Sequence, residues 1–277
     1  MNRIDTVFKI LRQRDEAALI PFLTAGDPDL ETTAGLIRTL VASGADLIEL
    51  GIPFSDPMAD GPTIQAASER ALQAGTTLAK VLRMVAEVRC DCQVPLVLMG
   101  YYNPVFRYGV DRFAADAAAA GVDGLLLVDL PPEEAAEVSI ALRRVGIAMI
   151  TLLAPTTPPE RMRRLAGAAE GYLYYVSMTG VTGTQQVKPD DIRAAVEVLQ
   201  GMTELPVGVG FGITTPEDAA AVARFADGVV VGSALIRIIE EYGGSPELLS
   251  RVSQFVVSLK QGITGGRKQR SALADSR

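Results

Sequence analysis

Two carboxylates, Glu49 and Asp60, are the residues of this sequence best suited to carry out chemistry. Glu49 lies in the apolar run Leu47–Gly51, and Asp60 follows eleven residues later, beyond a loop that contains Pro53 and Pro57. The 277-residue chain has no histidine, so acid–base chemistry falls mainly to carboxylates. A buried, unpaired carboxylate is costly unless its pKa shifts. The ordinary alternative is that Glu49 pairs with an arginine or caps a helix.

The elements that position these carboxylates follow a repeating pattern of short apolar runs and longer amphipathic stretches. The runs lack strict alternation, which is typical of strands that are buried on both faces. Eight strands are expected: Ala18–Thr24, Leu47–Gly51, Pro95–Gly100, Gly124–Asp129, Ile147–Leu153, Tyr172–Ser177, Pro206–Gly210 and Gly228–Gly232. Helices are expected between them, for example over Leu30–Ser43, Asp111–Ala120, Pro132–Val145, Asp190–Gln200 and Pro216–Phe225. This order predicts an α/β protein, a (β/α)8 TIM barrel.

Three further features concern the organisation of this barrel. An extra N-terminal helix is expected over Asn2–Arg14, and a long helix over Pro246–Gln261. A small residue followed by Asp precedes three of the strands, at Asp46, Asp123 and Asp227, which suggests a recurring helix-to-strand corner. Residues 1–264 are interpreted as a single catalytic domain. The tail 265–277 is basic and lacks periodicity, so we expect it to be disordered.

Composition excludes several classes of protein. Apolar residues make up 48% and charged residues 21%, which is typical of a globular protein with a large core. The net charge of −7 argues against nucleic acid or an anionic membrane as the main partner. No apolar run reaches the length of a membrane span and no signal peptide is seen, so a cytoplasmic location is expected. Cys90 and Cys92 would lack further ligands for a metal, so no metal is expected.

The active site of such a barrel forms at the carboxyl ends of its strands. Gly210, Gly212 and Gly232 allow backbone N–H groups to approach an anion, and Ser233 opens a helix with positive potential at its start. The predicted phosphate site comprises Gly183, Gly210, Phe211, Gly212, Gly232 and Ser233. The alternative is that these glycines serve only tight turns. The loop around Thr182 is interpreted as a mobile lid, with a plain flexible connection as its alternative.

The remaining strand-end residues narrow the range of reactions that the site could catalyse. None of the five lysines lies at a strand end, which counts against Schiff-base chemistry. An apolar pocket for a flat group is predicted from Phe22, Met99, Tyr101, Leu126, Leu152 and Tyr174. What remains is proton transfer by Glu49 and Asp60 on a phosphorylated substrate that supplies its own electron sink.

Five segments together resemble the tryptophan synthase alpha chain family. They are Pro21–Pro28, Ile48–Gln65, Met99–Pro104, Gly180–Gly183 and Gly210–Ile213, and the likeness covers about residues 1 to 264. The resemblance implies cofactor-free retro-aldol cleavage of indole-3-glycerol phosphate to indole and glyceraldehyde 3-phosphate. By the same resemblance, Glu49 would protonate the ring carbon and take up the hydroxyl proton. Asp60 would bind the indole N–H.

The family also implies a partner, a pyridoxal-phosphate-dependent beta chain that receives the indole in an alpha2beta2 complex. By this resemblance Pro53, Asp56, Asn103 and Pro104 would face the beta chain. Three other interpretations stay open: a phosphosugar isomerase barrel, a stand-alone indole-releasing lyase, and a barrel that only binds and activates a beta partner.

Overall fold

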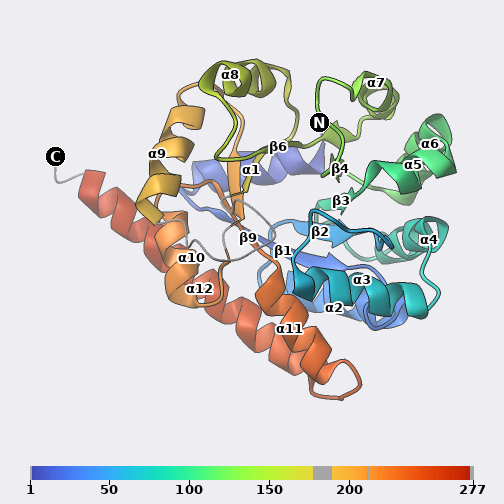
Figure 1. Cartoon of the computed structure of the whole chain (residues 1–277). Helices are drawn as coiled ribbons and strands as arrows, with labels where there is room; N and C mark the ends of the chain where they lie inside the picture. Colours follow the sequence, from blue (N-terminus) through green and yellow to red (C-terminus); the bar gives the residue numbers. More distant parts are fainter. Residues whose placement is uncertain (1, 177–188, 211, 275–277) are drawn as a thin grey trace.

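The computed structural model describes residues 2–176, 189–210 and 212–274, and within them the strands form one nearly closed parallel barrel (Figure 1). The strands are β1 (Ala18–Thr24), β2 (Ile48–Gly51), β3 (Leu96–Gly100), β4 (Gly124–Leu127), β5 (Ala148–Met149), β6 (Thr151–Leu153), β7 (Leu173–Val176), β8 (Val207–Gly210) and β9 (Gly228–Val231). Their spatial order is β5-β4-β3-β2-β1-β9-β8-β7-β6. The two edge strands of the sheet, β5 and β6, are separated in the chain only by Ile150. The sheet therefore closes into a barrel at this point. The predicted TIM barrel is confirmed, and the expected strand Ile147–Leu153 supplies both edge strands.

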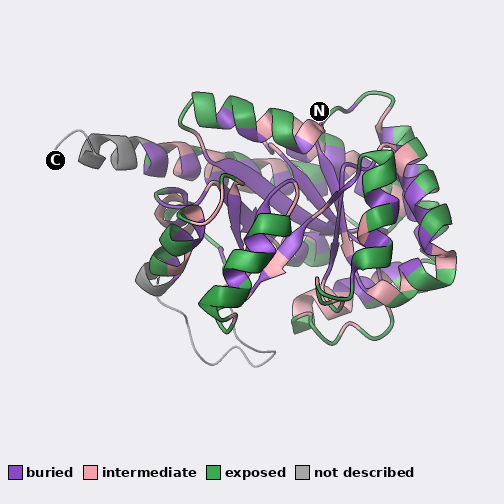
Figure 2. Ribbon diagram, turned by 90° about the horizontal axis from the view of Figure 1, so that it is seen from above, coloured by how far each residue is buried: buried purple, intermediate pink, exposed green. Residues whose placement is uncertain are grey.

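The helices surround this barrel, with their exposed faces outward and the strands buried at the centre (Figure 2). They are α1 (Arg3–Gln13), α2 (Leu30–Ala42), α3 (Pro62–Gln73), α4 (Leu78–Val88), α5 (Tyr102–Tyr108), α6 (Val110–Ala120), α7 (Ala136–Val145), α8 (Pro159–Ala168), α9 (Pro189–Gln200), α10 (Pro216–Ala223), α11 (Ser233–Tyr242) and α12 (Leu248–Ala274). None of the described helices has both the length and the apolar character that crossing a membrane requires.

The extra helix α1 closes the amino-terminal end of the barrel. Its buried residues Ile4, Phe8 and Leu11 recur at helical spacing and join the apolar cluster inside the barrel. Small residues in the barrel wall make room for them, since a Cβ on Gly124 would lie 3.1 Å from Ile4. Helix α1 therefore fills the amino-terminal end of the barrel interior.

The three aspartates of the sequence repeat have one structural role. Each carboxylate accepts a hydrogen bond from the backbone N–H near the start of a neighbouring strand: Asp46 from Leu19 at 2.7 Å, Asp123 from Leu96 at 2.9 Å and Asp227 from Val207 at 3.1 Å. The carboxylates thus join adjacent strands at the end of the barrel opposite the expected active site.

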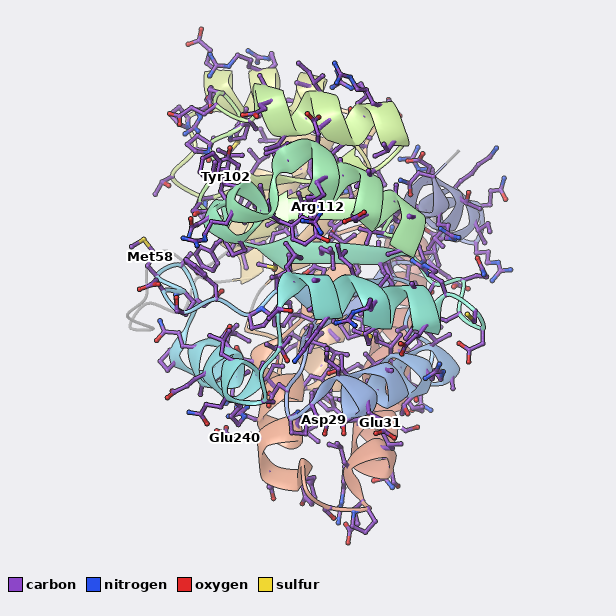
Figure 3. All side chains as sticks on the ribbon, turned by 90° about the vertical axis from the view of Figure 1, so that its right-hand side faces the viewer. Asp29, Glu31, Met58, Tyr102, Arg112 and Glu240 are labelled. Carbon is purple, nitrogen blue, oxygen red and sulfur yellow. The ribbon has the colours of Figure 1, made fainter. Side chains whose placement is uncertain are left out.

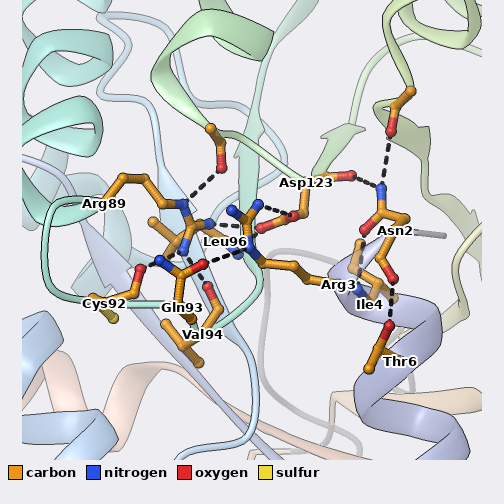
Figure 4. Close-up of polar contacts among 12 residues, drawn as sticks. Asn2, Arg3, Ile4, Thr6, Arg89, Cys92, Gln93, Val94, Leu96 and Asp123 are labelled. Carbon is orange, nitrogen blue, oxygen red and sulfur yellow. Dashed lines mark hydrogen bonds and ion pairs between the residues drawn. The ribbon is translucent and has the colours of Figure 1, made fainter.

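Each of these aspartates also pairs with a cation from a distant part of the chain. Asp46 pairs with Lys260 at 2.6 Å, Asp123 with Arg89 at 2.6 Å and Arg3 at 3.0 Å, and Asp227 with Arg267 at 3.4 Å. Figure 4 shows the group around Asp123, where Asn2 adds a bond to the backbone carbonyl of Asp123 at 2.7 Å. The terminal helices α1 and α12 therefore neutralise the charges that organise the barrel floor.

The C-terminal segment differs from the expectation of disorder, because helix α12 runs through residue 265 as far as Ala274. Gly266 lets α12 lie directly against α10, where a Cβ would collide with the carbonyl of Ala220. Arg267 is buried beside it and donates a hydrogen bond to the carbonyl of Ala223, the last residue of α10, at 3.1 Å. Composition shows that this segment is positively charged, but it gives no indication that Arg267 packs against α10.

Replacing Arg267 by alanine should therefore destabilise the barrel. The change leaves the carbonyl of Ala223 and the carboxylate of Asp227 without this donor, and we expect the free energy of unfolding to fall by about 2–4 kcal/mol. Urea denaturation measures the change. Arg251→Ala is the control, because the ion pair of Arg251 on α12 with Glu247, which precedes this helix, is exposed and should contribute little to stability. Equal effects of the two substitutions would contradict the assigned role of Arg267.

Candidate active site

Glu49 lies inside the barrel and is completely buried. In the β2 register it stands between Phe22 of β1 and Val97 of β3. Its Oε1 accepts a hydrogen bond from the hydroxyl of Tyr172 at 2.6 Å, while its Oε2 has no partner among the described residues. Burial raises the pKa of Glu49 to about 8, with the Tyr172 bond as the smaller, opposing effect. Glu49 is therefore mostly protonated at neutral pH.

Tyr172, which precedes β7, contacts Glu49 from the side of the barrel that faces helix α1. The Tyr172 ring is fully buried and packs against Phe8 of α1 with ring centroids 5.7 Å apart. Gly208 forms the barrel wall on another side of the Tyr172 ring, and a Cβ at this position would lie 3.3 Å from the ring. The Tyr172 hydroxyl is thereby fixed at the level of Glu49. Sequence reasoning placed this tyrosine in a strand but assigned it no role, because a strand residue shows no sign of its partner in the sequence.

Asp60 lies at the end of the loop between β2 and α3. The Tyr101 hydroxyl donates to its Oδ2 at 3.1 Å and accepts a bond from the Ala59 N–H at 2.9 Å. The side-chain amide of Gln65 donates to the Asp60 carbonyl at 2.8 Å. Burial raises the pKa of Asp60 to about 6, opposed by the Tyr101 bond. Asp60 is therefore mostly ionised at neutral pH.

Helix α3 and the end of β3 hold this loop in place. The Phe54 N–H donates to Ser68 Oγ at 3.3 Å, and the Phe54 ring packs against Tyr101 at 5.1 Å between centroids. Proline at the first position of α3 fixes the start of the helix directly after Asp60 and Gly61. The loop conformation therefore depends on tertiary contacts and could not be read from its Pro-rich composition.

A small cavity of about 20 Å³ lies between the loop and the strand ends. Its lining brings together three of the predicted pocket residues, Phe22, Met99 and Tyr101, with Asp60. Sequence reasoning missed its other members, which are Thr24, Gly51, Ile52, Ile64, Ser68, Gly100 and Val128. The other three predicted pocket residues do not line this cavity. Leu126 and Tyr174 belong to the apolar cluster inside the barrel, and Leu152 packs against that cluster.

The residues predicted to bind phosphate lie at the ends of β8 and β9. Gly210 ends β8, and a Cβ there would collide with the Tyr174 hydroxyl, so packing also requires this glycine. Gly212 has φ +30°, a conformation that favours glycine. Gly232 precedes α11, whose first residue is Ser233, and as a glycine it offers this helix start no side-chain cap. The start of such a helix is suited to an anionic acceptor.

Three predicted residues, Gly183, Phe211 and Thr182, lie outside the described residues, and their roles stay predictions. No cluster of three or more potential metal-ligating side chains occurs in the described part of the chain. Cys90 and Cys92 are free thiols.

The predicted partner surface is only partly exposed. Asp56 and Asn103 are exposed, whereas Pro53 is buried and supports the loop from inside. Two apolar side chains that sequence reasoning missed stand beside them: Met58 is 76% exposed and Phe106 is 62% exposed. Figure 3 shows Met58 projecting from the edge on which Tyr102 also lies. Tyr102 packs against Phe106 with ring centroids 5.7 Å apart, and exposed apolar side chains that adjoin one another are typical of a protein-contact surface.

The larger cavity of about 680 Å³ lies elsewhere, between α7 and α8. Ion pairs of Glu133 with Arg161 and Arg164 span it, and a pair of Arg143 with Glu170 lies along its wall. Its lining includes Asp129 and Leu152 but neither Glu49 nor Asp60. A choice of the active site by cavity volume alone would therefore miss both Glu49 and Asp60.

The fold, with buried Glu49 inside the barrel and half-buried Asp60 at the strand ends, is that of a (β/α)8-barrel enzyme. The family model described as "Tryptophan synthase alpha chain" matches residues 8–264. The chain belongs to the tryptophan synthase alpha chain family. Members of this family cleave indole-3-glycerol phosphate, and the chain is the alpha subunit of a tryptophan synthase, a carbon–carbon lyase of tryptophan biosynthesis.

Individual relatives support this assignment over nearly the whole chain. The alpha chain of Citrifermentans bemidjiense is 56% identical, over 96% of this chain and 99% of the relative. That of Geotalea uraniireducens is 57% identical, over 95% and 98%. The crystal structure of the alpha subunit from Legionella pneumophila str. Paris has a TM-score of 0.89 at 47% identity, covering 95% and 99%.

The raised pKa of Glu49 makes a prediction about stability. Its pKa lies near 8 in the folded protein against an ordinary value of 4.5, so the folded state binds the proton more tightly. The contribution of the protonated side chain is complete below pH 4.5 and is lost as the pH rises toward 8. Glu49→Gln should therefore gain stability relative to wild type over this interval, by roughly 3–5 kcal/mol.

Chemical denaturation of both proteins at a series of pH values measures this difference. Glu247→Gln, an exposed carboxylate on the surface of the barrel, serves as the control and should show no such trend. A stability difference between Glu49→Gln and wild type that is flat from pH 4.5 to pH 8 would show that Glu49 is not held protonated.

Proposed function

We propose that Glu49 is the acid and the base of the cleavage of indole-3-glycerol phosphate. The supporting observation is its complete burial with Oε1 held by Tyr172 and Oε2 without a described partner. A carboxyl kept protonated at neutral pH can donate its proton to the ring carbon that bears the side chain. The ring then becomes an iminium-like electron sink. The carbon–carbon bond breaks as the side-chain hydroxyl loses its proton to the Glu49 carboxylate, which regenerates the acid.

Asp60 is assigned the complementary task of binding the indole N–H. Its pKa near 6 keeps it mostly ionised at neutral pH, so its charge can stabilise the positive charge that develops on the ring nitrogen. The apolar residues Phe22, Met99, Tyr101, Leu126, Leu152 and Tyr174 would enclose the ring. The phosphate would bind at the opposite end, on Gly210, Gly212, Gly232 and Ser233, where the start of α11 favours an anion.

The family partnership with a beta chain gives this chain its role in a complex. We propose an alpha2beta2 assembly in the cytoplasm, in which pyridoxal phosphate belongs to the beta chain and this chain holds no cofactor. The two free cysteines fit a reducing compartment. The exposed residues Asp56, Met58, Asn103 and Phe106 are proposed as part of the contact surface, together with the neighbouring Pro104.

Substituting the two carboxylates tests the proposed chemistry. Glu49→Gln should lower the rate of indole formation by about 10²–10⁴-fold, because a positioned proton donor contributes a factor of this order. Asp60→Asn should cause a similar but smaller loss. Indole release from indole-3-glycerol phosphate by the purified chain is the measurement, with and without a beta chain. Glu247→Gln is the control for loss of a carboxylate.

Substantial turnover by Glu49→Gln would refute this assignment. High activity that a beta chain leaves unchanged would favour a stand-alone lyase, and binding of a beta chain without any turnover would favour a non-catalytic barrel.

The contact surface can be tested separately. Phe106→Ser should weaken binding of the beta chain about tenfold or more, because buried aromatic side chains often dominate the affinity of an interface. Val198→Ser is a matched control, since Val198 is 49% exposed on α9, whereas Phe106 lies on α5. Calorimetric titration with the beta chain measures both affinities. Equal affinities for the two variants would place the contact surface elsewhere.

A further inference from the structure

Thr24 has a buried hydroxyl that neither the fold nor the proposed chemistry uses. It is the last residue of β1 and is 2% exposed, and its Oγ1 has no hydrogen-bond partner among the described residues. A buried hydroxyl without a partner costs folding free energy, so natural proteins contain few. Burial of a valine at this position would avoid that cost. The presence of a threonine therefore points to a state in which the hydroxyl has a partner.

The position of Thr24 indicates what that partner is. In the register of β1 and β2, Phe22 lies opposite Glu49 and Thr24 lies opposite Gly51. Strand alternation puts Phe22 and Thr24 on the same, inward face, with Thr24 nearer the mouth of the barrel. Thr24 and Asp60 both line the cavity of about 20 Å³ beside Tyr101. The two side chains therefore border one and the same small cavity.

Gly51 lies opposite Thr24 on β2 and makes room for the Phe22 ring. A Cβ at Gly51 would lie 2.6 Å from Cζ of Phe22, which would displace that ring. Thr24 therefore lies between a glycine on β2 and an aromatic ring on its own strand, and neither offers its hydroxyl a side-chain hydrogen-bond partner.

Asp60 needs such a donor when the site is filled. Within the described residues, its carboxylate receives one side-chain hydrogen bond, from Tyr101 to Oδ2. A bound ligand removes water from around the carboxylate, and an ionised, desolvated carboxylate requires further donors to stay charged.

We propose that the Thr24 hydroxyl donates a second hydrogen bond to the Asp60 carboxylate when substrate occupies the site, and so holds Asp60 ionised against the ring nitrogen. Thr24 is thus a positioning residue that acts through Asp60. This inference rests on the proposed function of Asp60. The titratable groups that interact with Asp60 among the described residues are Tyr101 from the end of β3 and Tyr174 from β7, and Tyr174 also interacts with Glu49.

The test uses Thr24→Val, which removes the hydroxyl at nearly constant shape, and Thr24→Ser, which keeps it. Without ligand, Thr24→Val should melt at the same temperature as wild type or higher, because no bond is lost. Thr33→Val is the matched control. Thr33 is a fully buried threonine whose Oγ1 accepts from Gly26 N–H at 3.0 Å and donates to the Asp29 carbonyl at 2.7 Å. Its replacement should lower the melting temperature.

In the indole-release assay, Thr24→Val should reduce kcat about tenfold or more, a typical factor for losing a hydrogen bond to a charged group, with a smaller change in KM. The acid limb of the kcat profile should move to higher pH, because Asp60 in the substrate complex loses a donor to its charged form, whereas the kcat/KM profile, which reports the free enzyme, should not move. Thr24→Ser should retain most of the wild-type rate and the wild-type profile.

A double-mutant cycle with Asp60→Asn decides whether the effect passes through Asp60. On the Asp60→Asn background, Thr24→Val should change kcat by no more than about twofold, since the charged acceptor is already gone. Losses that multiply would overturn the inference, as would a melting temperature lowered as far as in Thr33→Val with kcat preserved. If Glu49→Gln abolished turnover while Thr24→Val left kcat and KM unchanged, the proposed function would stand and the role of Thr24 would be rejected.

Discussion

The burial of the Glu49 carboxyl is the constraint on which the rest of the site depends. A carboxyl removed from water keeps its proton unless donors or cations stabilise its charge, and Glu49 receives one bond, from the Tyr172 hydroxyl. That bond requires the Tyr172 ring to stand inside the barrel, which in turn requires the small wall residue Gly208 and the packing of Phe8 from α1. The N-terminal helix therefore helps to position Glu49 from the opposite end of the barrel, because it fixes the tyrosine that bonds to this proposed acid.

In this fold the amino-terminal end of the barrel generally serves stability, and the carboxyl-terminal end carries the active site. At the amino-terminal ends of the strands, Asp46, Asp123 and Asp227 join neighbouring strands, and cations from α1, α4 and α12 neutralise them. At the carboxyl ends, Glu49 and Asp60 have no cationic partner among the described ion pairs. A cation close to a carboxylate stabilises its charged form, so the paired aspartates act as structural anions, whereas burial of Glu49 and Asp60 without a cation favours the protonated form.

The sequence was informative where a single residue type determines the outcome and uninformative where two distant segments must meet. Strands buried on both faces, the aspartate corners and the pair Glu49 and Asp60 could all be predicted from local pattern. The break at Ile150, which yields two short strands, depends on barrel closure and has no local signal. The helical course of residues 265–274 depends on the fit of Gly266 against α10. The burial of Pro53, the hydroxyl bond of Tyr172 and the unpartnered Thr24 are likewise invisible until the fold is built.

The loop that carries Asp60 connects chemistry with partner binding in one short segment. Its inner end is held by Tyr101 and Gln65, which bond to Asp60 and its neighbour, while Met58, two residues away, projects into solvent. A protein that covers Met58 must act on the same loop, because two residues allow little independent movement. Any shift of the loop changes the distance between Asp60 and its donors, and with it the charge on Asp60. If Asp60 binds the indole N–H as proposed, coupling between a beta chain and this site needs no longer pathway than this loop.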